Sequence, residues 1–112
     1  MTSLSQQHCS PVNKSDAVLN EDQIKSYLIE LNNLWQTDKE NSSIGREFKL
    51  KNYYETIAFV NAVAWIVHDQ DHHPDLNVSY NRCHITFSTH SISGLSINDF
   101  ICAAKINEIS NR

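Results

Sequence analysis

The longest regular segment of the chain, from Tyr53 to about Asp71, sets the strongest limit on the fold. Asn52, followed three positions later by Glu55, forms a capping-box pattern that places a helix start at Tyr53. Apolar residues cover most of the circumference of this predicted helix. It should therefore be buried on more than one side, with a sheet on one face and a subunit partner on another. Pro74 ends the helix, because the residue before a proline is pushed out of the α region.

Shorter elements precede this central helix. Asn20 with Gln23 is a second capping-box pattern, and the apolar residues that follow it at helical spacing predict a first helix. Residues 35–50 contain two extended stretches around a polar loop, which predicts a hairpin. The first half of the chain is therefore expected to run helix, strand, strand.

Two further strands and a last helix follow the central helix. Residues 78–88 alternate between apolar and polar side chains, which indicates two strands with Asn81 at or near their turn. Ser96, with Asp99 at the third position, starts a final helix. The predicted order is α-β-β-α-β-β-α. This order is typical of an α+β, two-layer domain whose helices cover one face of a four-stranded antiparallel sheet.

The length of the chain limits its domain organisation. A chain of 112 residues has room for one compact core. Residues 1–18 are polar and show no period, which predicts a flexible N-terminal tail. Residues 19–112 are then expected to form a single domain. Because a domain of this size has a small core, a homodimer or a homotetramer is expected.

Charge and cysteine content restrict the partners and the compartment. The net charge is −4 and the basic residues are scattered, which argues against direct binding to nucleic acid. No segment has the roughly 18 apolar residues of a membrane span, and the first twenty residues lack the apolar core of a secretory signal. A cytoplasmic protein with no membrane partner is expected. Cys9, Cys83 and Cys102 form no C-x-x-C pair and are odd in number, which predicts reduced thiols.

Histidines are concentrated in one part of the chain. Five of the six lie between positions 68 and 90, and His68, His72 and His73 fall within six residues. Imidazole has an unperturbed pKa near about 6.5, so several histidines in one pocket can divide the roles of proton donor and acceptor. His68 and His72 are four residues apart and are expected to share a helix face. His90, at the predicted end of the last strand, can return toward the same place.

The spacing of these residues resembles the signature of the pterin-4a-carbinolamine dehydratase family. The matching positions run from His68, through three residues, to His72, His73 and Pro74, then to Tyr80, His90 and Asp99. The resemblance covers roughly residues 20–110. Many members of this family carry an acid at the position of His68.

The resemblance implies an activity and roles for the histidines. The activity is dehydration of 4a-hydroxytetrahydropterin to quinonoid dihydropterin, which recycles the pterin used in aromatic amino acid hydroxylation. The family needs no metal and no organic cofactor. His72, His73 and His90 are the implied catalytic residues. His72 and His90 are the acid and base candidates on opposite sides of the pterin, and His73 binds and orients the ring.

The remaining signature residues are implied to bind the substrate, and some have a structural alternative. His68, Pro74, Tyr80 and Asp99 form this group. Asp99 is equally well explained as the capping residue of the last helix. Pro74 is sufficiently explained as a helix stop. Tyr80 and Trp65 are expected to be packing residues rather than catalysts.

Two other classes of function stay open at this point. Some animal relatives of the family also dimerise a homeodomain transcription factor through their long helix, so an interaction module of the coactivator type is one alternative. The other is a metal-binding protein in which His68 and His72 are ligands and His90 or Asp71 completes the site.

Overall fold

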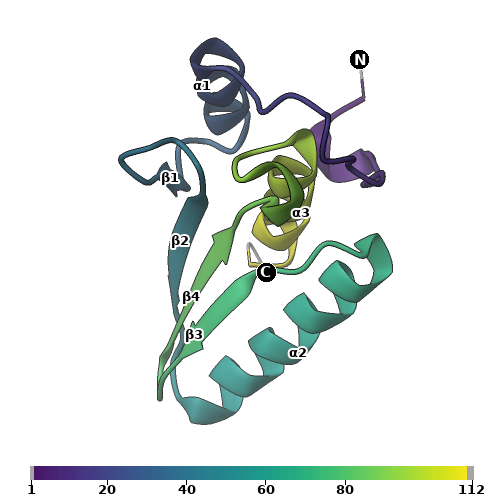
Figure 1. Ribbon diagram of the computed structural model, residues 1–112. Coiled ribbons are helices and arrows are strands. Elements are labelled where there is room, and N and C mark those ends of the chain that lie inside the picture. The colour runs from purple at the N-terminus through teal and green to yellow at the C-terminus, as the bar shows by residue number, and fades with distance from the viewer. Residues whose placement is uncertain (1, 111–112) are drawn as a thin grey trace.

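The chain folds into two layers, a four-stranded sheet and the helices packed against it (Figure 1). The computed structural model describes residues 2–110; Met1 and residues 111–112, at the outer ends of the predicted tail and domain, lie outside the described residues. The elements, in order, are η1 (Leu4–Gln6), α1 (Glu21–Glu30), β1 (Gln36–Thr37), β2 (Ile44–Lys49), α2 (Tyr53–Gln70), β3 (Asp75–Val78), β4 (Arg82–Phe87), η2 (His90–Ile92) and α3 (Ile97–Ser110). The predicted α+β class and the predicted order of helices and strands are confirmed.

The sheet is antiparallel throughout, with the strand order β1-β2-β4-β3. β4 is a central strand, and its Cys83 lies opposite Phe48 of β2 and Val78 of β3. Cys83, Ile85 and Phe87 of β4 are fully buried, whereas the alternate residues of the strand are exposed or half-buried: Arg82, His84 and Thr86. The alternation seen in the sequence therefore places one face of β4 against the helices.

α2 lies along the helical side of the sheet but buries only one of its own faces (Figure 1). The helix begins as predicted, because the Asn52 side chain accepts a hydrogen bond from the backbone N–H of Glu55 at 3.0 Å. Val63 and Val67 are buried, whereas Tyr54 is 87% exposed and Trp65 is 73% exposed. Within a single chain, α2 is therefore not buried on more than one side, and Trp65 does not have the packing role that the sequence predicts. Within residues 2–110, no helix combines the length and the apolar character needed to cross a membrane.

α3 is the most deeply buried helix and forms the centre of the core. Phe100 and Ile106 are fully buried, and Phe100 packs against Tyr27 of α1 with ring centroids 5.2 Å apart. Trp35, just before β1, donates a hydrogen bond from Nε1 to the Asn107 side chain at 2.8 Å. This helix therefore joins α1, the sheet and α2, and its first turn reaches the end of α2.

The N-terminal segment differs from the expected flexible tail, because residues 4–10 pack against the domain. Leu4 is 2% exposed, and its backbone N–H donates to Glu30 of α1 at 3.0 Å. Further along, the Leu19 N–H donates to the Leu95 carbonyl at 2.9 Å. Single apolar residues such as Leu4 produce no period in a sequence, so only the tertiary contacts reveal that this segment is held in place.

Candidate functional site

The C-terminal end of α2 turns the chain sharply and sets the direction of the histidines. Asp71 adopts a left-handed conformation at φ 52° and ψ 44°, and the His72 N–H bonds back to the Val67 carbonyl at 3.1 Å. Such a left-handed residue is a common way to end a helix. The expectation that His68 and His72 share a helix face is therefore wrong, because the helix has already ended before His72. His68 lies on the exposed surface of α2.

The second side of the site is the segment that follows β4. This strand ends at Phe87, and His90 begins the short helix η2 rather than ending the strand as predicted. Thr89 and Gly94 form an isolated bridge, with the Thr89 N–H donating to the Gly94 carbonyl at 2.8 Å. This bridge closes the loop that carries His90 and holds it beside the end of α2.

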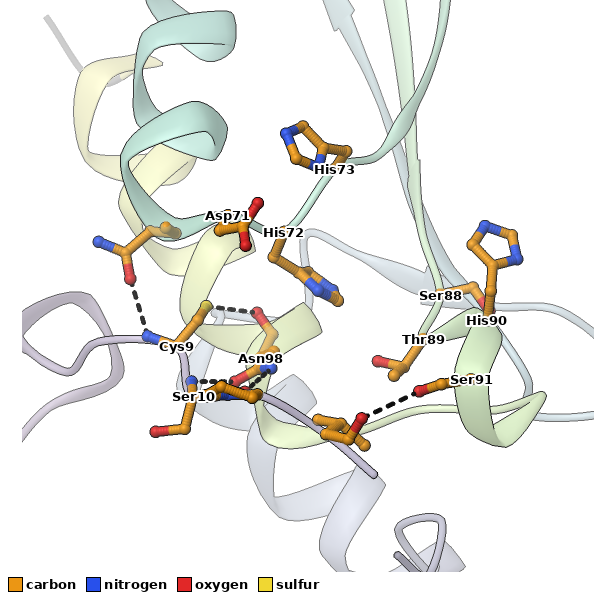
Figure 2. Close-up of a pocket in the computed structure, with 13 residues that line it drawn as sticks. Cys9, Ser10, Asp71, His72, His73, Ser88, Thr89, His90, Ser91 and Asn98 are labelled. Atoms are coloured by element: carbon orange, nitrogen blue, oxygen red, sulfur yellow. Dashed lines mark hydrogen bonds between the residues drawn. The ribbon is translucent and has the colours of Figure 1, made fainter. Parts of the chain in front are cut away.

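A cavity of about 380 Å³ lies between these two segments and the N-terminal segment. Its volume is within the range of roughly 300–1,000 Å³ that is usual for small-molecule sites. Figure 2 shows His72 at the helix end, with His73 and His90 on two sides of the opening. The lining residues are Cys9, Ser10, Pro11, Val12, Gln70, Asp71, His72, His73, Ser88, Thr89, His90, Ser91 and Asn98.

A buried carboxylate, Asp99, holds His72 in place. Asp99 is 0% exposed, and its Oδ1 lies 2.6 Å from Nε2 of His72. Its Oδ2 accepts hydrogen bonds from the Thr89 hydroxyl at 2.8 Å and from the Ser96 N–H at 3.0 Å. The Ser96 hydroxyl lies 2.7 Å from the Thr89 hydroxyl and donates to it, since the Thr89 proton is already directed at Asp99. Asp99 thus connects the end of α2, the end of β4 and the start of α3.

The surroundings of His72 favour its charged form. Burial alone would lower the pKa of His72, but the hydrogen bond and the negative charge of Asp99 outweigh burial and raise this pKa above its usual value. The imidazole ring also stacks on Phe87, with centroids 5.9 Å apart and planes 8° from parallel. These contacts give the ring a defined orientation at the wall of the cavity.

The structure brings together some of the predicted site residues and separates others. His72, His73 and His90 line one cavity. Asp99 contacts His72 instead of lining the cavity. It also accepts a hydrogen bond from the Ser96 N–H, which is the bond that the third residue of a capping box makes, so its structural role at the start of α3 is present. A carboxylate with no exposed surface supports the site from behind the histidine instead of binding a ligand directly.

The other predicted substrate-binding residues lie outside the cavity lining. His68 is exposed, and Pro74 is half-buried in the turn after His73. Tyr80 is 63% exposed at the β3–β4 turn, where its carbonyl accepts a hydrogen bond from Thr56 in the first turn of α2. Because β3 leads the chain away from the end of α2, Tyr80 lies near the opposite end of that helix from His72.

Several lining residues were not identified from the sequence. Cys9 and Ser10 belong to the segment that was expected to be a tail, and no periodicity marks them. Thr89 carries no signal in the sequence, although its hydroxyl donates a hydrogen bond directly to Asp99. Hydrogen bonds between residues distant in sequence leave no pattern that spacing can reveal.

The metal-binding alternative depends on where the donor side chains lie. Among residues 2–110, no group of three or more histidine, cysteine, aspartate or glutamate side chains is placed so that it could hold a metal ion. Of the two proposed ligands, His68 is exposed on α2, whereas His72 lies beyond the end of that helix and contacts Asp99.

Comparisons with known proteins agree with the resemblance of the signature. The family model described as pterin 4 alpha carbinolamine dehydratase matches residues 17–109. A protein of Legionella pneumophila (strain Lens) is 53% identical over 110 residues, covering 97% of each chain, and one of Nitrosomonas eutropha is 46% identical over 104 residues, covering 93% of this chain and 90% of the other. Both carry the provisional name pterin-4-alpha-carbinolamine dehydratase.

Solved structures show the same fold. The crystal structure of a transcriptional coactivator/pterin dehydratase from Brucella melitensis matches with a TM-score of 0.79 and 32% identity, covering 84% of this chain and 99% of that one. A pterin dehydratase-like protein described as a RuBisCO assembly factor in the alpha-carboxysome matches with a TM-score of 0.60 at 21% identity, covering 68% and 88%. The second likeness concerns the fold alone.

Proposed function

Because the chain belongs to the pterin-4a-carbinolamine dehydratase family, we propose that it is an enzyme that dehydrates 4a-hydroxytetrahydropterin to quinonoid dihydropterin. This reaction would recycle the pterin consumed in aromatic amino acid hydroxylation, and the compartment we propose is the cytoplasm. The observation that carries the proposal is the meeting of His72, His73 and His90 around one cavity, with His72 held by a buried carboxylate.

The reaction requires two proton transfers. The hydroxyl that leaves the ring carbon must gain a proton, and the adjacent ring nitrogen must lose one. We assign the first transfer to His72, since Asp99 raises its pKa and so favours the imidazolium form. Nε2 of His72 is engaged by Asp99, which leaves Nδ1 to pass the proton. His90, from the other side of the cavity, would accept the proton from the ring nitrogen.

We propose that His73 binds and orients the pterin ring. Its side chain lines the cavity beside His72 but is exposed, and it comes directly before Pro74, which restricts its backbone. A binding residue acts on the ground state and the transition state alike, so its removal should weaken substrate binding more than turnover. No metal ion or organic cofactor is part of the proposed reaction.

His73→Ala is expected to raise KM by roughly tenfold with little change in kcat, because a lost hydrogen bond to a ligand is worth about 1.5 kcal/mol. The carbinolamine can be generated with an aromatic amino acid hydroxylase and its loss followed by absorbance. His84→Ala is a matched control, because His84 is an exposed strand residue that does not line the cavity. A fall in kcat at unchanged KM would contradict the binding role.

A second proposed function, association through α2, is favoured by the unpartnered face of that helix. Tyr54, Ala58, Ala62 and Trp65 are exposed and follow one another at helical spacing, so they form a continuous stripe. Apolar stripes of this kind are commonly covered by another subunit. We propose that the stripe joins copies of the chain into a homodimer or a homotetramer. A coactivator role, which the Brucella melitensis protein carries in its name, would use the same face.

Trp65→Glu is expected to lower the oligomeric state, because it places a charge in the proposed interface, at a residue that is 73% exposed in the single chain. Light scattering coupled to size-exclusion chromatography would measure the molar mass. Ile29→Glu is the control, since Ile29 is an exposed apolar residue of α1, outside the stripe. An unchanged mass for Trp65→Glu, or the same loss of mass in both variants, would rule out the stripe as the specific interface.

A further inference from the structure

The N-terminal segment forms one wall of the cavity and is tied to two helices. The Cys9 N–H donates to the Gln70 side chain at the end of α2, at 2.8 Å. Ser10 makes two hydrogen bonds with the Asn98 side chain in the first turn of α3, at 3.2 and 2.7 Å (Figure 2). The position of this wall therefore depends on a few contacts around Cys9.

Cys9 also contacts a second thiol. Its Sγ lies 3.7 Å from Sγ of Cys102, which is fully buried on α3 one turn after Asp99. Cys9 itself is half-buried and lines the cavity, so solvent and small molecules reach it first. A disulfide needs the two sulfurs at about 2.0 Å, so a further approach of roughly 1.7 Å would allow the bond.

We propose that Cys9 and Cys102 form a redox-active thiol pair, in which a hydroperoxide oxidises Cys9 and Cys102 then closes an intrachain disulfide at the wall of the cavity. In the first step the Cys9 thiolate attacks the peroxide oxygen, giving a sulfenic acid and releasing hydroxide or alkoxide. In the second step the Cys102 sulfur displaces hydroxide from that sulfenic acid, and this hydroxide leaves as water with the thiol proton. The peroxide is reduced by two electrons, and the two thiols supply them.

The surroundings of the two sulfurs divide these roles. The hydrogen bond from Cys102 lowers the pKa of Cys9, and the nearby positive charges of His72 and Lys105 act in the same direction, against burial and the negative charge of Asp99. The contact with Cys9, together with burial, raises the pKa of Cys102. An accessible thiol with a lowered pKa beside a second thiol is the arrangement that reacts with peroxide and then resolves to a disulfide.

The disulfide would fasten the N-terminal segment to the helix that holds His72. Cys102 and Asp99 are three residues apart on α3, and the Cys102 Sγ lies 3.9 Å from the His72 carbonyl. Without the disulfide, the N-terminal segment is held at the cavity by hydrogen bonds. A covalent link from Cys9 to α3 would prevent this segment from moving away from the cavity. Oxidation would thereby control how freely the cavity opens.

Mass spectrometry of the full chain tests the pair without any measurement of pterin turnover. After hydrogen peroxide treatment under native conditions, the Cys83→Ser variant is expected to lose two hydrogen atoms, and peptides containing Cys9 and Cys102 should be linked until a reductant is added. In the oxidised chain, hydrogen exchange at the Cys9 and Ser10 amides should slow by roughly tenfold.

Two matched variants keep the result specific. Cys9→Ser should abolish the link, and Cys102→Ser should leave a sulfenic acid at position 9 that a dimedone probe captures. Cys83 is fully buried, so the wild-type chain should keep this thiol after the same treatment. The proposal is overturned if Cys9 can still be alkylated after peroxide treatment, or if it is found linked only to another chain or over-oxidised without a link to Cys102.

Discussion

His72→Ala is expected to lower kcat for the proposed dehydration by roughly 10²- to 10⁴-fold, the usual contribution of one positioned proton-transfer group. Among residues 2–110, His72 is the one imidazole of the cavity that contacts a buried carboxylate, and the variant removes it. Asp99 keeps its hydrogen bonds from Thr89 and Ser96. KM should change little, because a proton donor acts mainly in the transition state. The assay that follows loss of the carbinolamine measures both constants.

Two controls separate chemistry from folding in this experiment. Circular dichroism and thermal unfolding of His72→Ala should show a folded domain, because the change removes one partly buried ring and leaves the core residues of α3 in place. His84→Ala, on the exposed side of β4, should keep wild-type rates. A His72→Ala enzyme within about threefold of wild type would rule out His72 as the proton donor.

Asp99→Asn is expected to lower kcat by roughly tenfold to a hundredfold and to move the alkaline limb of the pH–rate profile to lower pH. The carboxylate raises the pKa of His72, so a neutral amide should bring that pKa down and leave less imidazolium at neutral pH. The amide oxygen of the variant can still accept hydrogen bonds from the Ser96 N–H and the Thr89 hydroxyl. In that orientation the amide NH₂ group faces Nε2 of His72. The neutral ring would then carry its proton on Nδ1, as a poor acid.

The sign of the effect follows from the proposed role. A proton donor is active when charged, so wild-type activity should fall as the pH rises through the pKa of His72, and Asp99→Asn should show this fall earlier. NMR titration of the His72 ring protons measures the pKa directly. An unshifted His72 pKa, or an alkaline limb that stays in place, would contradict the role of Asp99 as a positioning residue.

The same pair makes stability depend on pH. The folded pKa of His72 lies above its ordinary value of about 6.5, so its contribution to stability is fully present below that value and is lost as the pH rises through the folded pKa. Asp99→Asn should flatten this dependence. Thermal unfolding of both proteins across this pH window gives the comparison.

Sequence alone determined the fold class, the order of elements and the helix starts. The Asn20 capping box and the Asn52 cap are present in the structure, and the alternation in β4 matches its buried and exposed residues. These features depend on neighbours within a few positions, because a cap or a strand period is a local property. The family resemblance, carried by spacing from His68 to Asp99, is confirmed by the match over residues 17–109.

Tertiary structure decided which signature residues share a cavity. The left-handed turn at Asp71 separates His68 from His72, and β3 carries Tyr80 away from the helix end. Conversely, the fold brings Cys9 to the cavity and turns Asp99 behind His72, across 27 positions of sequence. Such contacts arise from the packing of α2, α3 and the sheet against one another. Spacing along the chain identifies the residues, whereas the direction of each side chain follows only from how those elements pack.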